Sequence, residues 1–351
     1  MFVNTAQNSS LMTSPNLSTI DNSNGSNSCS EGVFWEWLYT FQPIYIMMVC
    51  ITGLVGNIFV LIVICLHKSH CTVPEIYLGN LAGADLLLLA CVWAINIFQH
   101  FNWFFEEFLC RYVNPMIYMN LYSSVYFLVM VSVDRYLALV KVLRHGRIRT
   151  VSCAKINCFF IWLFGLLMSS PVFIFQKVIH IPDLNISACL LDFPHEYGIL
   201  TMDIILIVIV FLVPAAIISF CTFQILNVLR NNQMQRFKQV HKESKATNLV
   251  LIVLLAFVIF WLPFQLITFL SIFYEANLLS GCTWLMLFVN GYPIANCLAL
   301  TNNCINPILY VIVGKQFRKK ARELYVQAVA RMEPMSVTPS QPKTHQKSTK
   351  S

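Results

Sequence analysis

The stretch CRYVNPMIYMNLYSSVYFLVMVSVDRYLALVK, from Cys110 to Lys141, decides the fold. Its middle part, from Val113 to Val133, contains no charged residue. About 20 such residues form a helix that crosses the hydrocarbon core of a bilayer, about 30 Å thick. A cysteine lies at one end, and an Asp-Arg-Tyr triplet at 134–136 lies at the other. We therefore predict a membrane-spanning helix that links an outer disulfide candidate to an inner ionic triplet.

The composition extends this prediction to the whole chain. Hydrophobic residues make up 57% of the sequence, charged residues only 11%, and the mean hydropathy is +0.66, whereas soluble domains carry about 25% charged residues. Seven apolar segments are long enough to cross a membrane as helices: 41–66, 75–98, 108–133, 152–175, 198–229, 247–273 and 284–313. The predicted fold class is an all-α membrane protein, a seven-transmembrane helix bundle with a short amphipathic helix after the last span.

The distribution of charge predicts the orientation. With the N-terminus outside, the outer segments hold ten acids and two bases, and 21 of the 23 Lys and Arg residues lie at or inside the cytoplasmic boundary. This asymmetry is the positive-inside pattern. Four glycosylation sequons fall on the same outer side: Asn8, Asn16, Asn24 and Asn185. We expect a multi-pass plasma-membrane protein with an extracellular N-terminus.

Four parts follow from these patterns: a glycosylated N-terminus (1–34), a seven-helix transmembrane domain (35–313), an amphipathic helix (314–328) and a disordered cytoplasmic tail (329–351). The inner loop from Arg230 to Lys245 is short and basic. The amphipathic helix is predicted to lie on the anionic inner leaflet of the bilayer. Its apolar face is formed by Phe317, Ala321, Leu324 and Tyr325.

Four of the 13 cysteines fall in outer segments: Cys29, Cys110, Cys189 and Cys282. An oxidising exterior favours two disulfides, but sequence alone does not fix their connectivity. We pair Cys110 with Cys189, which joins the loop after the fourth span to the third span. We pair Cys29 with Cys282, with the alternative that these two remain free.

Short polar side chains gather at similar depth on three spans: Asp85, Asn120, Ser124, Asn302, Asn303 and Asn306. An acid in the middle of a membrane costs a few kcal/mol and usually faces a polar cavity. Carboxylate, amide and hydroxyl oxygens suit a hard monovalent cation. The alternative is a protonated Asp85 within a hydrogen-bond network.

The outer face is acidic, which favours a cationic ligand and speeds its encounter. Glu196, Asp203 and Glu275 are the candidates to meet a basic group of the ligand. For any single acid, a solvated surface position is an equally good interpretation. The pocket beneath is predicted to be lined by Trp93, Tyr118, Phe264, Gln265 and Thr268.

Together these features resemble the rhodopsin-like class of G-protein-coupled receptors over residues 35–328. The resemblance rests on Asn57, Asp85 in the LAGAD run, Cys110 with Cys189, Asp134-Arg135-Tyr136, Trp162, Pro214, FWLP at 260–263 and Asn306-Pro307-Ile-Leu-Tyr310. Each motif alone is short, but their order along successive spans is specific.

Within this class the chain resembles the bradykinin (kinin) receptors. The stretches that carry the resemblance include CLHKSHCTVPEIYLGNLAGADL, FNWFFEEFLCRYVN, VLRNNQMQRFK and VIVGKQFRKK. The inner half is most similar to the subtype for intact kinins. The outer loop IPDLNISACLLDFPHE is more similar to the subtype for kinins that lack their C-terminal Arg, so the subtype stays open.

The resemblance implies a receptor for a small cationic peptide that signals through a heterotrimeric G protein, phospholipase C and calcium. It also implies arrestin and receptor kinases as partners of the tail, and sodium in the polar cluster. The implied activation switch comprises Asp134, Arg135, Tyr136, Phe257, Trp261, Pro263, Pro307 and Tyr310. In it, Asp134 pairs with Arg135 at the inner mouth, Trp261 pivots above Phe257 at the Pro263 kink, and Asn306 satisfies a carbonyl freed by Pro307. The plainer alternatives are an interfacial ion pair, core packing and a structural kink.

Several positions depart from the kinin-receptor pattern. The second span lacks two residues between Asp85 and Trp93, Ser271 replaces an outer acid, Tyr118 stands where one subtype has Lys, and Thr222 replaces a tyrosine. These differences leave the exact peptide open, and an angiotensin-like peptide is an alternative ligand.

Other functions fit the sequence less well. Retinal would need a lysine within 284–313, and amine ligands would need an acid at Ile117. A seven-helix transporter would need several buried charges or inverted repeats. An enzyme would need a cluster of catalytic side chains or metal ligands, and the histidines are scattered. We expect no enzymatic activity, no cofactor apart from a sodium ion and no nucleic-acid partner.

Overall fold

The structure is a computed structural model that describes residues 34–67, 71–98, 107–140, 149–181, 186–195, 197–231, 237–313 and 315–332. Its helices are α2 (Phe34–Leu66), α3 (Val73–Phe98), η1 (Leu109–Val113), α5 (Asn114–Leu139), α6 (Val151–Phe175), α7 (Gly198–Ile205), η3 (Leu206–Leu212), α8 (Val213–Asn231), α9 (Phe237–Glu275), α10 (Cys282–Val313) and α11 (Lys315–Met332). Two strands, β1 (Gln176–Ile181) and β2 (Ile186–Leu191), form an antiparallel hairpin.

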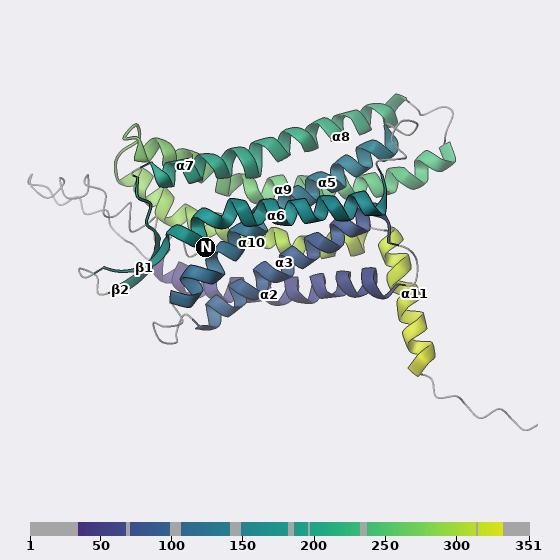
Figure 1. Cartoon of the computed structure of the whole chain (residues 1–351), viewed down its shortest axis with the longest axis horizontal. Coiled ribbons are helices and arrows are strands. Elements are labelled where there is room, and N and C mark those ends of the chain that lie inside the picture. Colours follow the sequence, from purple (N-terminus) through teal and green to yellow (C-terminus); the bar gives the residue numbers. More distant parts are fainter. Residues whose placement is uncertain are drawn as a thin grey trace, which may run out of the picture.

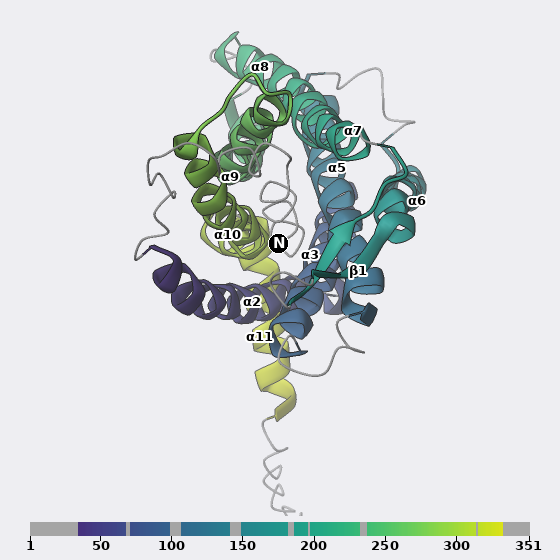
Figure 2. The same cartoon turned by 90° about the vertical axis from the view of Figure 1, so that its left-hand side faces the viewer.

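Within the described residues, seven helical spans are long and apolar enough to cross a membrane. They run roughly parallel along the long axis of the molecule (Figure 1). Viewed from the end that carries the hairpin, they surround a common centre, with α3 beside α2 and α10 beside α9 (Figure 2). This arrangement confirms the predicted seven-helix fold.

The span of η1 and α5 is the most enclosed of the seven. In its most apolar window 56% of the residues are buried, a larger share than in any other span. Helix α5 packs against α3, α6 and α8, and its Tyr122, Phe127 and Leu128 side chains lie in the main core cluster. The stretch from which the fold was predicted is therefore also its central element.

The hairpin of β1 and β2 covers the end of this span that the charge pattern predicts to be extracellular, called the outer end below. The predicted disulfide between Cys110 and Cys189 is confirmed and joins η1 to β2, with the two Cα atoms 5.6 Å apart. Cys282 is also disulfide-bonded, and its predicted partner Cys29 lies outside the described residues. The four predicted glycosylation sites lie outside them as well: Asn8, Asn16, Asn24 and Asn185.

Helix α11 leaves the end of the bundle opposite the hairpin, predicted to be cytoplasmic and called the inner end below, and runs across the direction of the spans (Figure 1). Two ion pairs join α11 to the segment between α2 and α3. His67, just after α2, lies 2.8 Å from Glu323 (Nε2 to Oε2), and Glu75, in the first turn of α3, lies 2.7 Å from Lys320 (Oε1 to Nζ). The hydrogen bond from His67 lowers the pKa of Glu323, because it favours the carboxylate form. These contacts fix α11 where a membrane-surface helix is expected.

Two sequence-based boundaries need correction. Helix α9 begins at Phe237, inside the segment predicted to be the third inner loop, because membrane thickness limits an apolar run but not a helix. Helix α11 continues to Met332, beyond residue 328, through residues with good helix propensity. In the predicted apolar face, Phe317 and Leu324 are half-buried and Tyr325 is 70% exposed.

Candidate functional site

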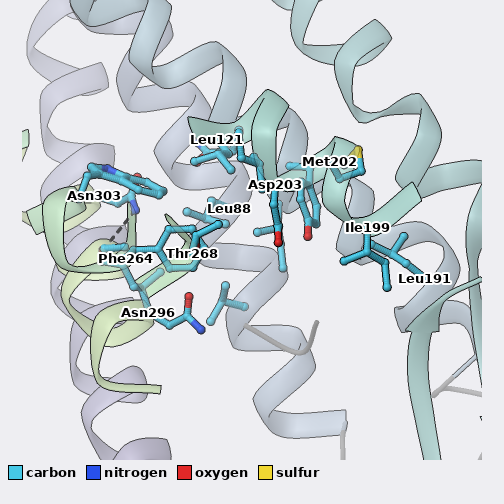
Figure 3. A pocket seen from close by; sticks show the side chains of 18 of the residues that line it. Leu88, Leu121, Leu191, Ile199, Met202, Asp203, Phe264, Thr268, Asn296 and Asn303 are labelled. Carbon is cyan, nitrogen blue, oxygen red and sulfur yellow. Dashed lines mark hydrogen bonds between the residues drawn. The ribbon is translucent and has the colours of Figure 1, made fainter. Parts of the chain in front are cut away.

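A cavity of about 170 Å³ lies in the half of the bundle that carries the hairpin (Figure 3). Five spans and β2 converge on it. Its residues are Leu88, Val92, Ile117, Tyr118, Asn120, Leu121, Leu190, Leu191, Ile199, Met202, Asp203, Leu206, Trp261, Phe264, Thr268, Asn296, Ala299, Leu300 and Asn303. The lining is largely apolar with a few polar groups, which is typical of a ligand pocket.

Asp203 is the acidic residue of this pocket. It is the one acid among the lining residues that the structure describes, and none of them is Lys, Arg or His. Its side chain comes from α7 and lies opposite Phe264 and Thr268 of α9 (Figure 3). Glu275, at the end of α9, is near enough for the two carboxyl groups to interact electrostatically. A positive group would therefore be attracted to this wall of the pocket.

The structure brings together four of the predicted pocket residues: Tyr118, Asp203, Phe264 and Thr268. Trp93 is 42% exposed and Gln265 is buried, and neither lines the cavity. Both predictions were therefore wrong about the face of the helix. Glu275 lies near Asp203 but outside the lining, and Glu196 lies outside the described residues.

Several lining residues were missed by the sequence analysis, among them Met202, Asn296 and the hairpin residues Leu190 and Leu191. Asn296 and Asn303 are seven residues apart on α10, a spacing of two helical turns, so their common face was detectable. The contribution of β2 was not detectable from local periodicity, because the disulfide and the loop path place the hairpin over the cavity.

Ser271, which replaces a family acid, is buried and engaged within the helices. Tyr292 Oη donates to Ser271 Oγ at 2.8 Å, and Ser271 Oγ donates to the carbonyl of Thr268 at 2.8 Å. This position consequently offers no charge to a ligand. The acid of the pocket comes from α7 instead.

Most residues of the predicted polar cluster are deeply buried. Asp85, Asn120, Asn302, Asn303 and Asn306 are each at most 5% exposed, whereas Ser124 is half-buried. The Nδ2 atom of Asn306 donates to Asp85 Oδ2 at 3.2 Å. Buried oxygens of Asp85, Asn302 and Asn306 have no hydrogen-bond partner among the described atoms. Buried carboxylate and amide oxygens of this kind fit a small hard cation.

At the inner end, the ion pair of Asp134 differs from the expected one. Both of its oxygens accept from Arg149, at 2.7 Å from Nε and 3.2 Å from Nη2. Its partner is therefore not the adjacent Arg135 but a residue just before α6. Side chains of neighbouring helical residues point in different directions, which favours the more distant partner. Tyr136 packs on Phe220 of α8, with ring centroids 5.8 Å apart.

The carbonyl freed by Pro307 also has an unexpected partner. A proline cannot donate to the carbonyl four residues earlier, which here belongs to Asn303. Asn57 Nδ2 donates to that oxygen at 2.9 Å, and Asn306 is instead bonded to Asp85. The close approach depends on Gly56, where an added Cβ would lie 2.9 Å from Pro307 Cβ.

A row of aromatic rings connects the pocket with the bundle below it. Trp261 lines the pocket and contacts Phe264 at 6.0 Å and Phe257 at 6.1 Å between ring centroids. Pro263 interrupts the hydrogen-bond ladder of α9 beside these rings. Tyr310, near the inner end of α10, is buried against Phe317 of α11 at 6.3 Å. Of the predicted switch residues, Phe257 and Tyr310 belong to the main core cluster, and Trp261 packs against it.

Comparison with known proteins places this geometry in context. The family described as 7 transmembrane receptor (rhodopsin family) matches residues 56–310. The B2 bradykinin receptor of Sus scrofa is 50% identical over 305 residues, covering 86% of this chain and 83% of the relative. The Homo sapiens B2 bradykinin receptor is 47% identical over 312 residues, covering 88% and 80%. The B1 bradykinin receptor of Tupaia minor is 40% identical over 301 residues, covering 85% and 86%.

Proposed function

This chain belongs to the rhodopsin family of seven-transmembrane receptors, and within it to the bradykinin receptors, and from that premise we propose that it binds a small cationic kinin peptide. The N-terminus faces outward, so the hairpin and the acidic pocket are extracellular. Binding favours a conformation whose inner end accepts a heterotrimeric G protein, with phospholipase C and calcium downstream.

The observation that carries the ligand assignment is the charge of the pocket. Asp203 lies in the lining without a competing base among the described lining residues. Kinins end in arginine, and a guanidinium group forms strong bidentate hydrogen bonds with a carboxylate. Asp203 receives a ligand arginine, with Glu275 as a second acid on the path to the pocket.

The degree of similarity favours one subtype. The B2 receptors compared here are 47–50% identical to this chain, and the B1 receptors 38–40%. We therefore expect intact bradykinin to act more strongly than the peptide that lacks its C-terminal Arg. Arrestin and receptor kinases act on the cytoplasmic tail, where added phosphates supply negative charge.

Sodium is part of the same proposal. Asp85, Asn302 and Asn306 supply the oxygen atoms that would hold the ion, and Asn120, Ser124 and Asn303 complete the polar surroundings. The ion would neutralise Asp85 and hold α3 and α10 in the inactive arrangement. An agonist that draws these helices together competes with it thermodynamically.

The direct test is a calcium titration in cells that express the full chain at a measured surface level. Intact bradykinin, its des-Arg form and angiotensin II are compared, with untransfected cells as the control. We expect a saturable response to intact bradykinin at the lowest concentration. Silence to both kinins despite surface expression would contradict the assignment, and a response to angiotensin II alone would favour the alternative ligand.

A further inference from the structure

The hairpin has one strand edge that borders the ligand pocket. Strand β2 pairs on one side with β1. Leu190 and Leu191 of β2 line the cavity of Figure 3, whereas none of the described residues of β1 does. Successive side chains of a strand point to opposite faces, so a cavity that touches both leucines reaches around an edge of β2. That edge is the one not occupied by β1.

The hydrogen bonds of the hairpin show which main-chain groups point to this edge. In an antiparallel pair, opposite residues alternate between those that exchange hydrogen bonds and those that do not. The N–H of Asp192 donates to the carbonyl of Phe175 at 2.8 Å, which continues the register of the two strands. Leu191, one step along β2, is therefore turned the other way. Its opposite residue Gln176 accordingly donates its N–H to the carbonyl of Val172 in α6.

Two residues of β2 thus direct their main-chain groups away from β1. Leu191 and Cys189 both stand at non-bonded positions, opposite Gln176 and Val178. Among the described residues, no main-chain hydrogen bond outside the hairpin reaches either of them. They are two residues apart, about 7 Å along the strand, so this edge matches about three residues of an extended chain.

The edge is fixed before any ligand arrives. Cys189 is joined to Cys110 by the disulfide. The side-chain amides of Asn114 and Gln176 both donate to Cys189 Sγ, at 3.3 and 3.1 Å, and both residues are buried. A strand that already holds its bound conformation lowers the entropic cost of pairing with a flexible partner.

We propose that the peptide ligand binds in an extended conformation as a third strand on β2, with main-chain hydrogen bonds to Leu191 and Cys189. Addition of a strand to a sheet edge supplies affinity through the main chain and leaves specificity to the side chains. This mode of binding rests on the peptide function proposed above and adds how the ligand is held. The peptide then runs along the cavity that contains Asp203, and this part of its affinity needs no acid at Ser271.

Competition binding of intact bradykinin to variants with measured surface expression tests this pairing. Leu191→Pro removes the N–H from the edge, whereas Leu191→Ala keeps the N–H and shortens the side chain. Proline is tolerated at an edge position whose N–H is not used within the sheet. We expect the proline variant to bind about tenfold more weakly than the alanine variant, because a carbonyl of the ligand loses its donor.

Val178→Pro is the matched control. Val178 stands opposite Cys189 at a non-bonded position, so its N–H points to the other edge of the hairpin, away from β2. The substitution introduces the same ring into the same hairpin without touching the edge at the pocket. It should leave the affinity within about twofold of that of the unmodified receptor.

The ligand offers a second measurement, which does not depend on the folding of a variant. In a series of bradykinin analogues, each peptide N–H in turn is replaced by an ester oxygen, and binding to the unmodified receptor is measured. We expect losses of about fivefold or more at alternate residues of one segment, because every second residue of a strand turns its N–H to the same partner.

Three outcomes would overturn the pairing. The first is equal affinity of the Leu191→Pro and Leu191→Ala variants. The second is an equal loss in Val178→Pro, which would mean a distorted hairpin. The third is an ester series without alternating losses, and this series decides alone if Leu191→Pro does not reach the cell surface. In all three the unmodified receptor still binds bradykinin, whereas failure of the proposed peptide function would abolish that binding.

Discussion

At the scale of single residues, Asp203 is the side chain on which ligand recognition depends most. It brings a carboxylate to the wall of an otherwise largely apolar cavity. Removal of one partner of a buried charge pair costs about 2–5 kcal/mol, largely because the other charge stays buried without its counterpart.

We predict that Asp203→Asn weakens binding of intact bradykinin about 30-fold or more in competition binding. A peptide whose terminal arginines are replaced by citrulline carries no guanidinium charge. Its affinity should therefore change little when Asp203 is replaced by Asn. Asp192→Asn is the matched control, since this acid is half-exposed and pairs with Lys177 at the surface. Equal losses for both peptides would show that Asp203 does not contact a ligand arginine.

The pocket also shows where sequence reasoning reaches its limit. Composition and apolar length sufficed for the seven spans, because membrane thickness fixes the length of each run. The lining faces were harder, since one residue step rotates a side chain by about 100°. Val92 therefore lines the cavity while Trp93 faces outward, and Phe264 lines it while Gln265 packs between helices. An apolar span with little amphipathic contrast does not reveal which of two neighbours faces inward.

At the scale of elements, hydrogen bonds between distant segments were not predictable, although the groups that require them were. Proline 307 leaves the Asn303 carbonyl without its usual donor, and the sequence analysis assigned the nearby Asn306 to it. The structure uses Asn57, 246 residues away, at 2.9 Å. The close contact of α2 with α10 at Gly56 makes this bond possible, and only the packed bundle shows it.

We predict that Asn57→Ala destabilises the receptor by about 1–3 kcal/mol, because a buried carbonyl loses its donor. Pro307→Ala in the same chain should recover part of this loss, since the new N–H at position 307 can donate to Asn303. Pro307→Ala alone is the control. It should gain less stability, because Asn57 already donates to the Asn303 carbonyl. Thermal unfolding of the unmodified chain, the two single variants and the double variant in detergent gives the coupling energy between positions 57 and 307. Strictly additive effects of the two substitutions on stability would exclude the assigned hydrogen bond.

The pair of Asp134 and Arg149 joins α5 to the start of α6 and gives a second prediction at this scale. Arg149→Gln should lower the free energy of unfolding by about 2 kcal/mol. The Asp134 carboxylate, which is only 3% exposed, would lose its bidentate hydrogen bonds to a guanidinium group. Adding Asp134→Asn should restore part of the lost stability, because it removes the buried charge that has no partner in the Arg149→Gln protein. Lys177→Gln, which breaks an exposed pair, should change stability by less than about 1 kcal/mol. A fully stable Arg149→Gln protein would mean that another residue replaces this partner.

At the scale of the whole molecule, the peptide pocket and the polar cluster are parts of one continuous interior. Asn120 and Asn303 line the pocket and are buried beside the group that contains Asp85 and Asn306. The aromatic contacts of Trp261 continue toward the inner end of α9. A peptide at the outer end, the proposed sodium ion in the middle and a G protein at the inner end would act on the same helices, and their affinities would then be coupled reciprocally.

This coupling yields the last prediction, the effect of sodium on agonist binding. Raising NaCl should lower the affinity of intact bradykinin about fivefold or more, a coupling of about 1 kcal/mol, because sodium stabilises the arrangement that agonist disfavours. N-methylglucamine chloride at equal ionic strength controls for screening of the acidic outer face. Asp85→Asn should abolish the difference between the two salts, whereas Asp203→Asn should lower the affinity and leave the difference intact. Equal effects of both salts on the unmodified receptor would mean that the buried oxygens of Asp85, Asn302 and Asn306 are held by hydrogen bonds or water and not by a cation.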